Sequence, residues 1–149
     1  MDWLLHPFKS FSLWLTTRKF IKILEEEELD IFLETLLKVM SLFLFFNKKY
    51  RRNIDGFNAR YVFKSKDNII AASADFSGSR MKVSRKALEN AAVTVVFKDG
   101  AALKNFLFAE SPDIIGAILD SEVQYTGNLN YLSKFAYMSK RLKLQLTGK

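Results

Sequence analysis

The chain contains 149 residues and carries a formal net charge of +7, a length that fits one domain with a substantial hydrophobic core and excludes a second full domain. It has no cysteine and a single histidine, His6, which excludes disulfides, thiolate chemistry and a histidine-based metal site. The excess of positive charge favours a polyanionic partner, either nucleic acid or an anionic membrane. No cofactor is expected.

The first sixteen residues, MDWLLHPFKSFSLWLT, are rich in apolar side chains but do not match a secretory signal. Asp2 stands where a signal carries positive charge, polar residues interrupt the apolar ones, and no small-residue cleavage site follows. We expect an amphipathic helix lying in the plane of a membrane surface, and its membrane-contact residues are Trp3, Leu4, Leu5, Phe8, Phe11 and Trp14. Two alternatives stay open: the segment folds over the rest of the chain as a lid, or it pairs two chains.

A second helix is predicted from Asp30 to about Lys48. Asp30 is a candidate N-terminal cap, and Glu34 and Lys38 have the spacing of an i,i+4 ion pair. The acidic run EEEELD before this helix is interpreted as a solvated turn rather than a metal or acid/base site. The apolar stripe of the helix is wide enough to require burial on more than one side, yet its longest apolar run, LLKVMSLFLFF, is too short to span a membrane.

After the basic run NKKYRRN the pattern changes to the alternation typical of strands. Four strands are predicted near residues 60–64, 70–76, 80–84 and 93–97, and their short polar turns favour an antiparallel meander with an apolar inner face. The outer face is basic and carries Arg60, Lys64, Arg80, Lys82 and Arg85. Because Tyr61 and Phe63 alternate to the inner face, the outer face lacks the aromatic residues of a stacking platform, so a nucleic-acid partner is not favoured.

Helices are expected to cover the inner face of this sheet. One begins at Asp99-Gly100, and the next at Ser111-Pro112, where a capping serine precedes a proline at the first helical position. A fifth strand is predicted from Glu122 to Thr126. Gly127-Asn128 then opens a last helix with two apolar stripes.

The stretches VTVVFKDGAALKNFL, SPDIIGAILDSEVQYTGN and YLSKFAYMSKRL together resemble the sterol carrier protein type two family of lipid-binding domains. The resemblance covers about Ile54 to Leu146. It departs from the family pattern at Asp120 and Ser121, where many members have a glycine before the fifth strand, and at Asn128, where an acidic residue often follows Gly127.

The resemblance implies an α+β fold, in which a five-stranded, mainly antiparallel sheet is covered on one face by helices that enclose an apolar tunnel. From the change of pattern at NKKYRRN, we expect residues 1–50 to form an added N-terminal helical segment and residues 51–149 to form the lipid-binding domain. The candidate tunnel-wall residues are Phe106, Phe108, Ile115, Leu119, Tyr131, Phe135 and Met138. For each of them an ordinary core position is an equally good interpretation.

The function implied is that of an intracellular, non-catalytic protein that binds or transfers a fatty acyl, sterol-like or isoprenoid lipid. We expect it in the cytoplasm, peripheral on the inner face of the membrane, where Lys48, Lys49, Arg51 and Arg52 each add about 1 kcal/mol of attraction to anionic lipids. The alternative is an accessory or scaffold protein that presents isoprenoid or quinone precursors to a biosynthetic enzyme partner, and a homodimer is a further possibility. Enzymatic activity has the least support, because no nucleophile has a base oriented by a third residue.

Overall fold

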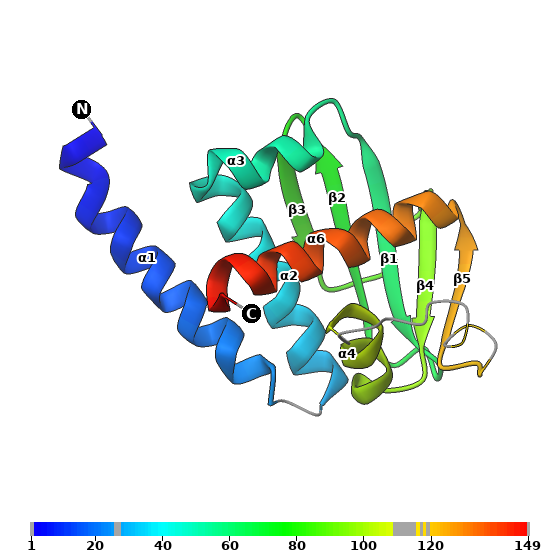
Figure 1. Ribbon diagram of the computed structural model, residues 1–149. Helices are drawn as coiled ribbons and strands as arrows, with labels where there is room; N and C mark the ends of the chain where they lie inside the picture. Colours follow the sequence, from blue (N-terminus) through cyan, green and yellow to red (C-terminus); the bar gives the residue numbers. More distant parts are fainter. Residues whose placement is uncertain (1, 26–27, 109–115, 117, 119, 149) are drawn as a thin grey trace.

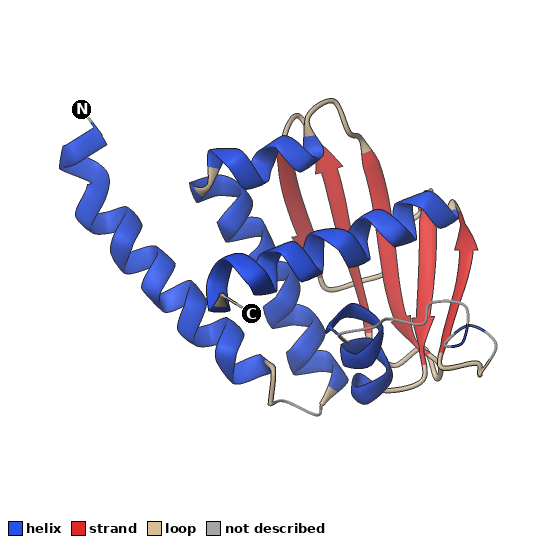
Figure 2. Cartoon of the chain, in the orientation of Figure 1, coloured by secondary structure: helices blue, strands red, loops and turns tan. Residues whose placement is uncertain are grey.

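Helices cover one face of a five-stranded sheet in the computed structural model, which describes residues 2–25, 28–108, 116, 118 and 120–148, with side chains from residue 13 onward (Figures 1 and 2). The helices are α1 (Asp2–Ile23), α2 (Leu29–Phe46), α3 (Lys48–Arg51), the 3-10 turn η1 (Arg52–Ile54), α4 (Gly100–Phe108) and α6 (Leu129–Thr147). The strands are β1 (Ala59–Ser65), β2 (Ala71–Ser77), β3 (Arg80–Ser84), β4 (Val93–Phe97) and β5 (Val123–Gly127). None of the helices in these described ranges is long and apolar enough to cross a membrane.

The sheet has the order β3-β2-β1-β4-β5 and confirms the predicted five-stranded, mainly antiparallel α+β fold. The meander prediction is wrong at β4, which pairs in parallel with β1, so that Phe63 lies opposite Val95. The β2–β3 hairpin and residues 85–92 together connect these two parallel strands, as a crossover must. Residues 85–92 run over the outer face of the sheet, where Ser73 Oγ donates to the Lys86 carbonyl (2.6 Å) and accepts from the Leu88 N–H (3.0 Å).

The predicted helix starts are correct in two of three described cases. Asp99 Oδ1 accepts the Ala102 N–H (2.8 Å) at the start of α4, and Asn128 Oδ1 accepts the Asn130 N–H (2.9 Å) at the start of α6. Asp30 is not a cap: it lies inside the first turn of α2, whose N-cap is Glu28. The sequence alone could not show which of these two acidic residues is the N-cap, since both precede the apolar stripe. The helix predicted from Ser111 begins outside the described residues.

One continuous hydrophobic core joins the inner face of the sheet to α1, α2, α4 and α6. Helix α2 is buried on two sides, as its wide stripe predicted: α1 packs on one side, and β2, β3, α4 and α6 pack on the other. The predicted i,i+4 pair forms within it, with 2.7 Å between Lys38 Nζ and Glu34 Oε1. Since residues on both sides of position 50 share this core, the proposed division at that position stays a prediction.

Candidate lipid-binding site

Five of the seven predicted wall residues lie in the described part of the chain, on the two helices that cover the sheet. Phe106 and Phe108 lie on α4, and Phe135 and Met138 lie on α6, all four with less than a tenth of their surface exposed. Tyr131, also on α6, is half-buried at the edge of the same core. Ile115 and Leu119 fall outside the described residues, so their place in this interior stays a prediction.

An aromatic layer lies between α6 and the inner face of the sheet. The Phe135 ring lies 4.8 Å from that of Phe63 and 5.6 Å from that of Tyr61, measured between ring centroids. The Tyr131 ring makes an edge contact with Phe57 at 5.1 Å. These rings lie within the contact range of aromatic pairs, so this half of the interior is built largely from hydrophobic side chains.

A second aromatic group lies at the helical end of the interior, around Phe108. Its ring meets Phe20 of α1 edge-on at 5.7 Å and Phe32 of α2 at 6.0 Å. Among the described ring contacts, none joins this group to the layer under α6. The described ring contacts therefore fall into two groups within the one core, and Phe20 of α1 packs on the group around Phe108.

Two buried tyrosines fix α6 over the sheet. Tyr61 donates its hydroxyl hydrogen to the Tyr131 carbonyl (2.7 Å), and Tyr50 donates to the Met138 carbonyl (2.8 Å). Burial raises the pKa of Tyr50 far above its usual value, against a smaller opposing effect of Arg141. Burial also raises the pKa of Tyr61, with Tyr131 adding to the rise. Both groups therefore stay neutral hydrogen-bond donors through the physiological range.

One polar atom inside this apolar interior lacks a partner. Ser139 is fully buried on α6, one residue after Met138, and its hydroxyl makes no hydrogen bond within the described residues. A buried hydroxyl without a partner costs free energy. It is also the kind of group that binds the polar end of a lipid.

Helix α1 turns different faces to the body of the protein and to the surroundings. Thr16, Phe20 and Ile23, spaced to share one face, are buried. Trp14 and Leu15, on the opposite side, are 51% and 39% exposed, and Arg18 lies over the Trp14 ring at 5.0 Å. Of the predicted membrane-contact residues, Trp14 is thus at the surface. Trp3, Leu4, Leu5, Phe8 and Phe11 belong to α1, but their side chains lie outside the described part.

An open apolar groove of about 740 Å³ runs between α1, α2 and the edge strand β3. Its apolar lining includes Ile31, Val39, Leu42 and Val83, and its charged lining is Lys19, Lys22 and Lys38. The volume lies within the range of ligand pockets. Sequence reasoning missed this groove because it assigned the apolar residues of α2 to one stripe. The signal was present in the spacing of Ile31, Thr35, Lys38 and Leu42, which share a second face of that helix.

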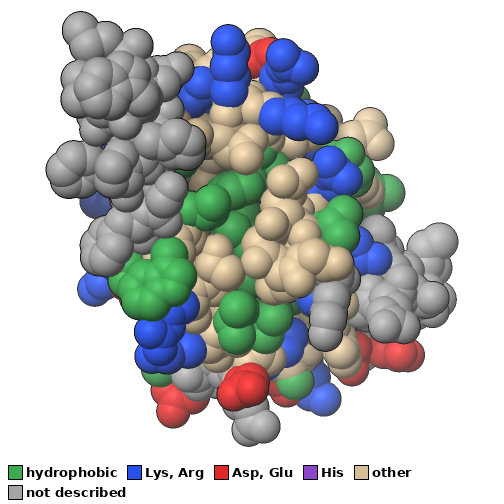
Figure 3. Space-filling model, turned by 60° about the vertical axis from the view of Figure 1, so that its left-hand side comes forward, with side chains coloured by type: hydrophobic (Ala, Val, Ile, Leu, Met, Phe, Trp, Pro, Cys, Tyr) green, Lys and Arg blue, Asp and Glu red, His purple; other side chains and the backbone are tan. Residues whose placement is uncertain are grey.

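The basic outer face of the sheet is partly neutralised. Arg60 Nη2 lies 3.0 Å from Asp75 Oδ2, and Lys82 is the cross-strand partner of Asp75 on the other side. The prediction that Arg85 belongs to this outer face is wrong, because it reaches α2 and pairs with Glu34. The hydrogen bond from Lys38, ahead of the charge of Arg85, lowers the pKa of the Glu34 carboxyl. These pairs weaken the case for a nucleic-acid surface there. On the face shown in Figure 3, by contrast, hydrophobic side chains gather near the middle with Lys and Arg side chains above them.

No family model and no curated protein matches this sequence, but solved structures share its fold. A structure described as a UbiJ-SCP2 ubiquinone synthesis protein aligns with a TM-score of 0.57 at 14% identity, over 72% of this chain and 87% of the other. Sterol carrier protein 2 from Yarrowia lipolytica, in its apo form, aligns with a TM-score of 0.56 at 13% identity, over 83% and 98% of the two chains.

The sterol carrier protein domain 2 of Helicoverpa armigera gives a TM-score of 0.54 at 12% identity, over 82% of this chain and 91% of the other. These alignments span most of both chains. The protein therefore has a sterol carrier protein type two-like fold, which confirms the resemblance predicted from its sequence.

Proposed function

We propose that this protein is a non-catalytic lipid-binding protein that holds a fatty acyl, sterol-like or isoprenoid lipid between its helices and its sheet, and that docks on anionic membranes from the cytoplasmic side. The observation that carries the proposal is the fold, which it shares with two structures described as sterol carrier proteins. The wall residues proposed are Phe106, Phe108, Ile115, Leu119, Tyr131, Phe135 and Met138.

The chemistry of the interior supports a hydrophobic ligand. Transferring each CH2 group of a lipid from water into an apolar site gains about 0.8 kcal/mol, and the apolar surroundings of Phe63 and Phe135 support placing the lipid there. The unpartnered Ser139 hydroxyl provides one hydrogen bond for a polar end group. A lipid with a long apolar part and a single polar end fits this combination best.

Membrane docking is supported by the outward side of α1. Trp14, Leu15 and Ile21 are exposed there, together with Arg18 and Lys22. Aromatic residues beside basic ones are typical of helices that lie at the headgroup level of anionic membranes. Residues Trp3, Leu4, Leu5, Phe8 and Phe11 extend the same composition toward the start of the helix.

A displacement assay with a fluorescent fatty acid tests the site. Met138→Trp adds bulk to the interior, and we expect it to weaken lipid binding by about tenfold or more while keeping the fold, since overpacking costs about 1–3 kcal/mol. Leu42→Glu places a charge in the open groove instead, where Leu42 is 41% exposed. Leu144→Glu, at a similarly exposed position on α6, is the matched control.

The proposal requires Met138→Trp alone to weaken binding. A loss caused by Leu42→Glu and not by Met138→Trp would place the lipid in the groove and contradict an interior site. Equal binding by all three variants would contradict a specific lipid site altogether.

A second candidate function is that of an accessory protein that presents isoprenoid or quinone precursors to a biosynthetic enzyme. It is favoured by one observation, the likeness of fold to a protein described as a ubiquinone synthesis protein. Affinity purification of the tagged protein, followed by identification of both bound lipid and bound protein, separates the two functions. A quinone precursor recovered with its enzyme supports the accessory role, and a fatty acyl lipid without a protein partner supports lipid transfer.

A further inference from the structure

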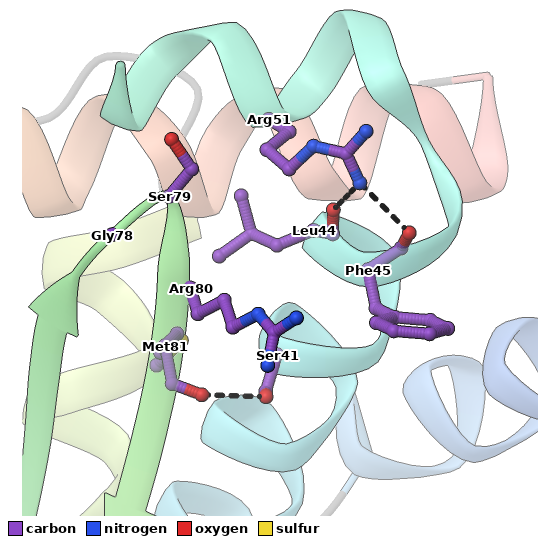
Figure 4. A pocket seen from close by; sticks show the side chains of 8 residues that line it. All are labelled: Ser41, Leu44, Phe45, Arg51, Gly78, Ser79, Arg80 and Met81. Atoms are coloured by element: carbon purple, nitrogen blue, oxygen red, sulfur yellow. Dashed lines mark hydrogen bonds between the residues drawn. The ribbon is translucent and has the colours of Figure 1, made fainter. Parts of the chain in front are cut away.

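A small pocket of about 300 Å³ lies between the C-terminal end of α2, helix α3 and the turn that joins β2 to β3 (Figure 4). Arg51 and Arg80 line it together with Ser41, Ser79, Phe45 and Met81. No aspartate or glutamate belongs to this lining, as far as the described residues go. The pocket lies outside the predicted lipid-binding interior, so its role is independent of the function proposed above.

Arg51 is held in place by the end of α2. Its Nη1 donates to the Phe45 carbonyl (3.0 Å) and to the Leu44 carbonyl (3.3 Å), so it satisfies two of the carbonyls that a helix leaves without a partner at its C-terminus. A guanidinium group has five N–H donors, and these two hydrogen bonds use only Nη1. The side chain is therefore positioned before any ligand arrives, with donors still available.

Arg80 faces the same pocket from the sheet. It follows a tight turn in which Gly78 and Ser79 both have positive φ, 58° and 59°, the conformation of a type I′ hairpin. Ser41 Oγ of α2 donates to the Met81 carbonyl of β3 (3.0 Å). This bond ties the helix to the edge strand, so the elements that carry Arg51 and Arg80 are held together, as Figure 4 shows.

The charges around this pocket are not neutralised as they are elsewhere. Arg60 and Arg85 pair with carboxylates, whereas no ion pair in the described part of the chain involves Arg51 or Arg80. The carbonyl end of α2 contributes about −0.5 of an elementary charge, which two guanidinium groups outweigh. Lys48, Lys49 and Arg52 add positive charge on the adjoining α3 and η1.

We propose that this pocket binds a phosphate group, with the guanidinium groups of Arg51 and Arg80 as its two cationic ligands. The planar fork of N–H donors in arginine matches phosphate oxygens better than a lysine does. Phe45 at the rim is 67% exposed, and an exposed phenyl ring beside a phosphate site suits a phosphate ester with an apolar part. A lipid headgroup and free phosphate share the required chemistry, and the experiment distinguishes them.

The test uses the full chain and two kinds of probe. Inorganic phosphate and sn-glycerol 3-phosphate are titrated while the backbone amide signals of Gly78, Ser79 and Arg80 are followed by NMR. In parallel, the protein is sedimented with phosphatidylcholine vesicles that either contain or lack phosphatidic acid. Arg80→Gln removes one proposed ligand from an exposed position, and Lys82→Gln removes the same charge from the same strand outside the pocket.

We expect Arg80→Gln to weaken binding by about tenfold, the usual contribution of one charge-assisted hydrogen bond, and Lys82→Gln to change it by less than about twofold. An Arg80-dependent response to the soluble phosphates supports the site with free phosphate as a ligand. An Arg80-dependent response only to vesicles with phosphatidic acid supports it with a lipid headgroup as the ligand. Equal losses in the two variants, or no response to either probe, would overturn the proposal.

Discussion

Gly127 lies at a close approach of two backbone segments, where a side chain has no room. Its φ is +106°, and a Cβ atom added there would lie 2.3 Å from the Ala92 carbonyl oxygen, because β5 pairs with β4 at this point. We expect Gly127→Ala to lower the free energy of unfolding by about 3 kcal/mol or more, from both strain and the displaced strand pair.

Gly56→Ala is the control for this prediction in urea denaturation. Gly56 also has a positive φ, +65°, but nothing lies within 4 Å of its added Cβ, so we expect only about 1 kcal/mol of destabilisation. Equal losses of unfolding free energy in the two variants would show that the close approach of Gly127 to Ala92 does not contribute to the cost of the substitution.

Ser139 allows a prediction in which stability and binding change in opposite directions. Ser139→Ala removes a buried hydroxyl without a partner, so we expect the lipid-free protein to gain about 1 kcal/mol of stability. If this hydroxyl binds the polar end of a lipid, affinity for a fatty acid falls by several fold in the same variant. Thermal denaturation with and without added fatty acid measures both changes, and a destabilised lipid-free variant would show that the hydroxyl already has a partner.

Tyr50 and Tyr61 link stability to alkaline pH. Burial raises both pKa values above the usual value of 10.0, so the unfolded chain releases these protons at a lower pH than the folded one. The stabilisation is complete below pH 10 and is lost as the pH rises above it, by up to about 1.4 kcal/mol per pH unit for each tyrosine. In urea denaturation at pH 9 to 11, the free energy of unfolding should fall less steeply with pH in the Tyr50→Phe and Tyr61→Phe variants than in the wild type. Tyr137→Phe, at a 55% exposed position, should keep the decline of the wild type.

The proposed function assigns different roles to the two halves of α1. Leu13, Trp14 and Leu15 are all exposed, whereas Thr16 and Phe20 are buried, and the N-terminal part of α1 extends away from the sheet in Figure 1. We expect deletion of residues 1–12 to change the free energy of unfolding by less than about 0.5 kcal/mol and to lower binding to phosphatidylserine-containing vesicles by about tenfold or more.

Phe20→Ala provides the contrast for the other half of α1. Phe20 is fully buried against Phe108, so its loss should cost about 3–5 kcal/mol in chemical denaturation. If the deletion of residues 1–12 destabilised the protein as much as Phe20→Ala does, the first half of α1 would have to pack on the body, and docking on a membrane through it would be contradicted.

The helices and strands were largely predictable from the sequence, but the strand beside which β4 lies was not. Alternation correctly placed Tyr61 and Phe63 on the inner face, because a period of two reports which side each residue takes. It does not report which strand lies next to which. Residues 85–92 look like a hairpin connection, but they cross β2, where Ser73 bonds to Lys86 and Leu88, and β4 pairs with β1 instead of β3.

At the scale of the whole molecule, the sites were less predictable than the fold. The apolar character of Phe106, Phe135 and Met138 predicted their burial correctly, but burial alone does not distinguish a tunnel wall from an ordinary core. The pocket lined by Arg51 and Arg80 could not be predicted from the sequence. The two arginines are distant in the chain, and they line the same pocket only because α2 packs along β3. The basic composition indicated an anionic partner without indicating where it binds.

The proposed function places a lipid between the helices and the sheet. Native mass spectrometry of the protein, purified without detergent and compared with its denatured form and a lipid extract, tests this most directly. We predict one lipid per chain, with a long apolar part and one polar end, and a higher melting temperature when that lipid is added back. A lipid-free protein whose melting temperature does not change with any fatty acid, sterol or isoprenoid would contradict the claim, and would leave these apolar helices as an ordinary core.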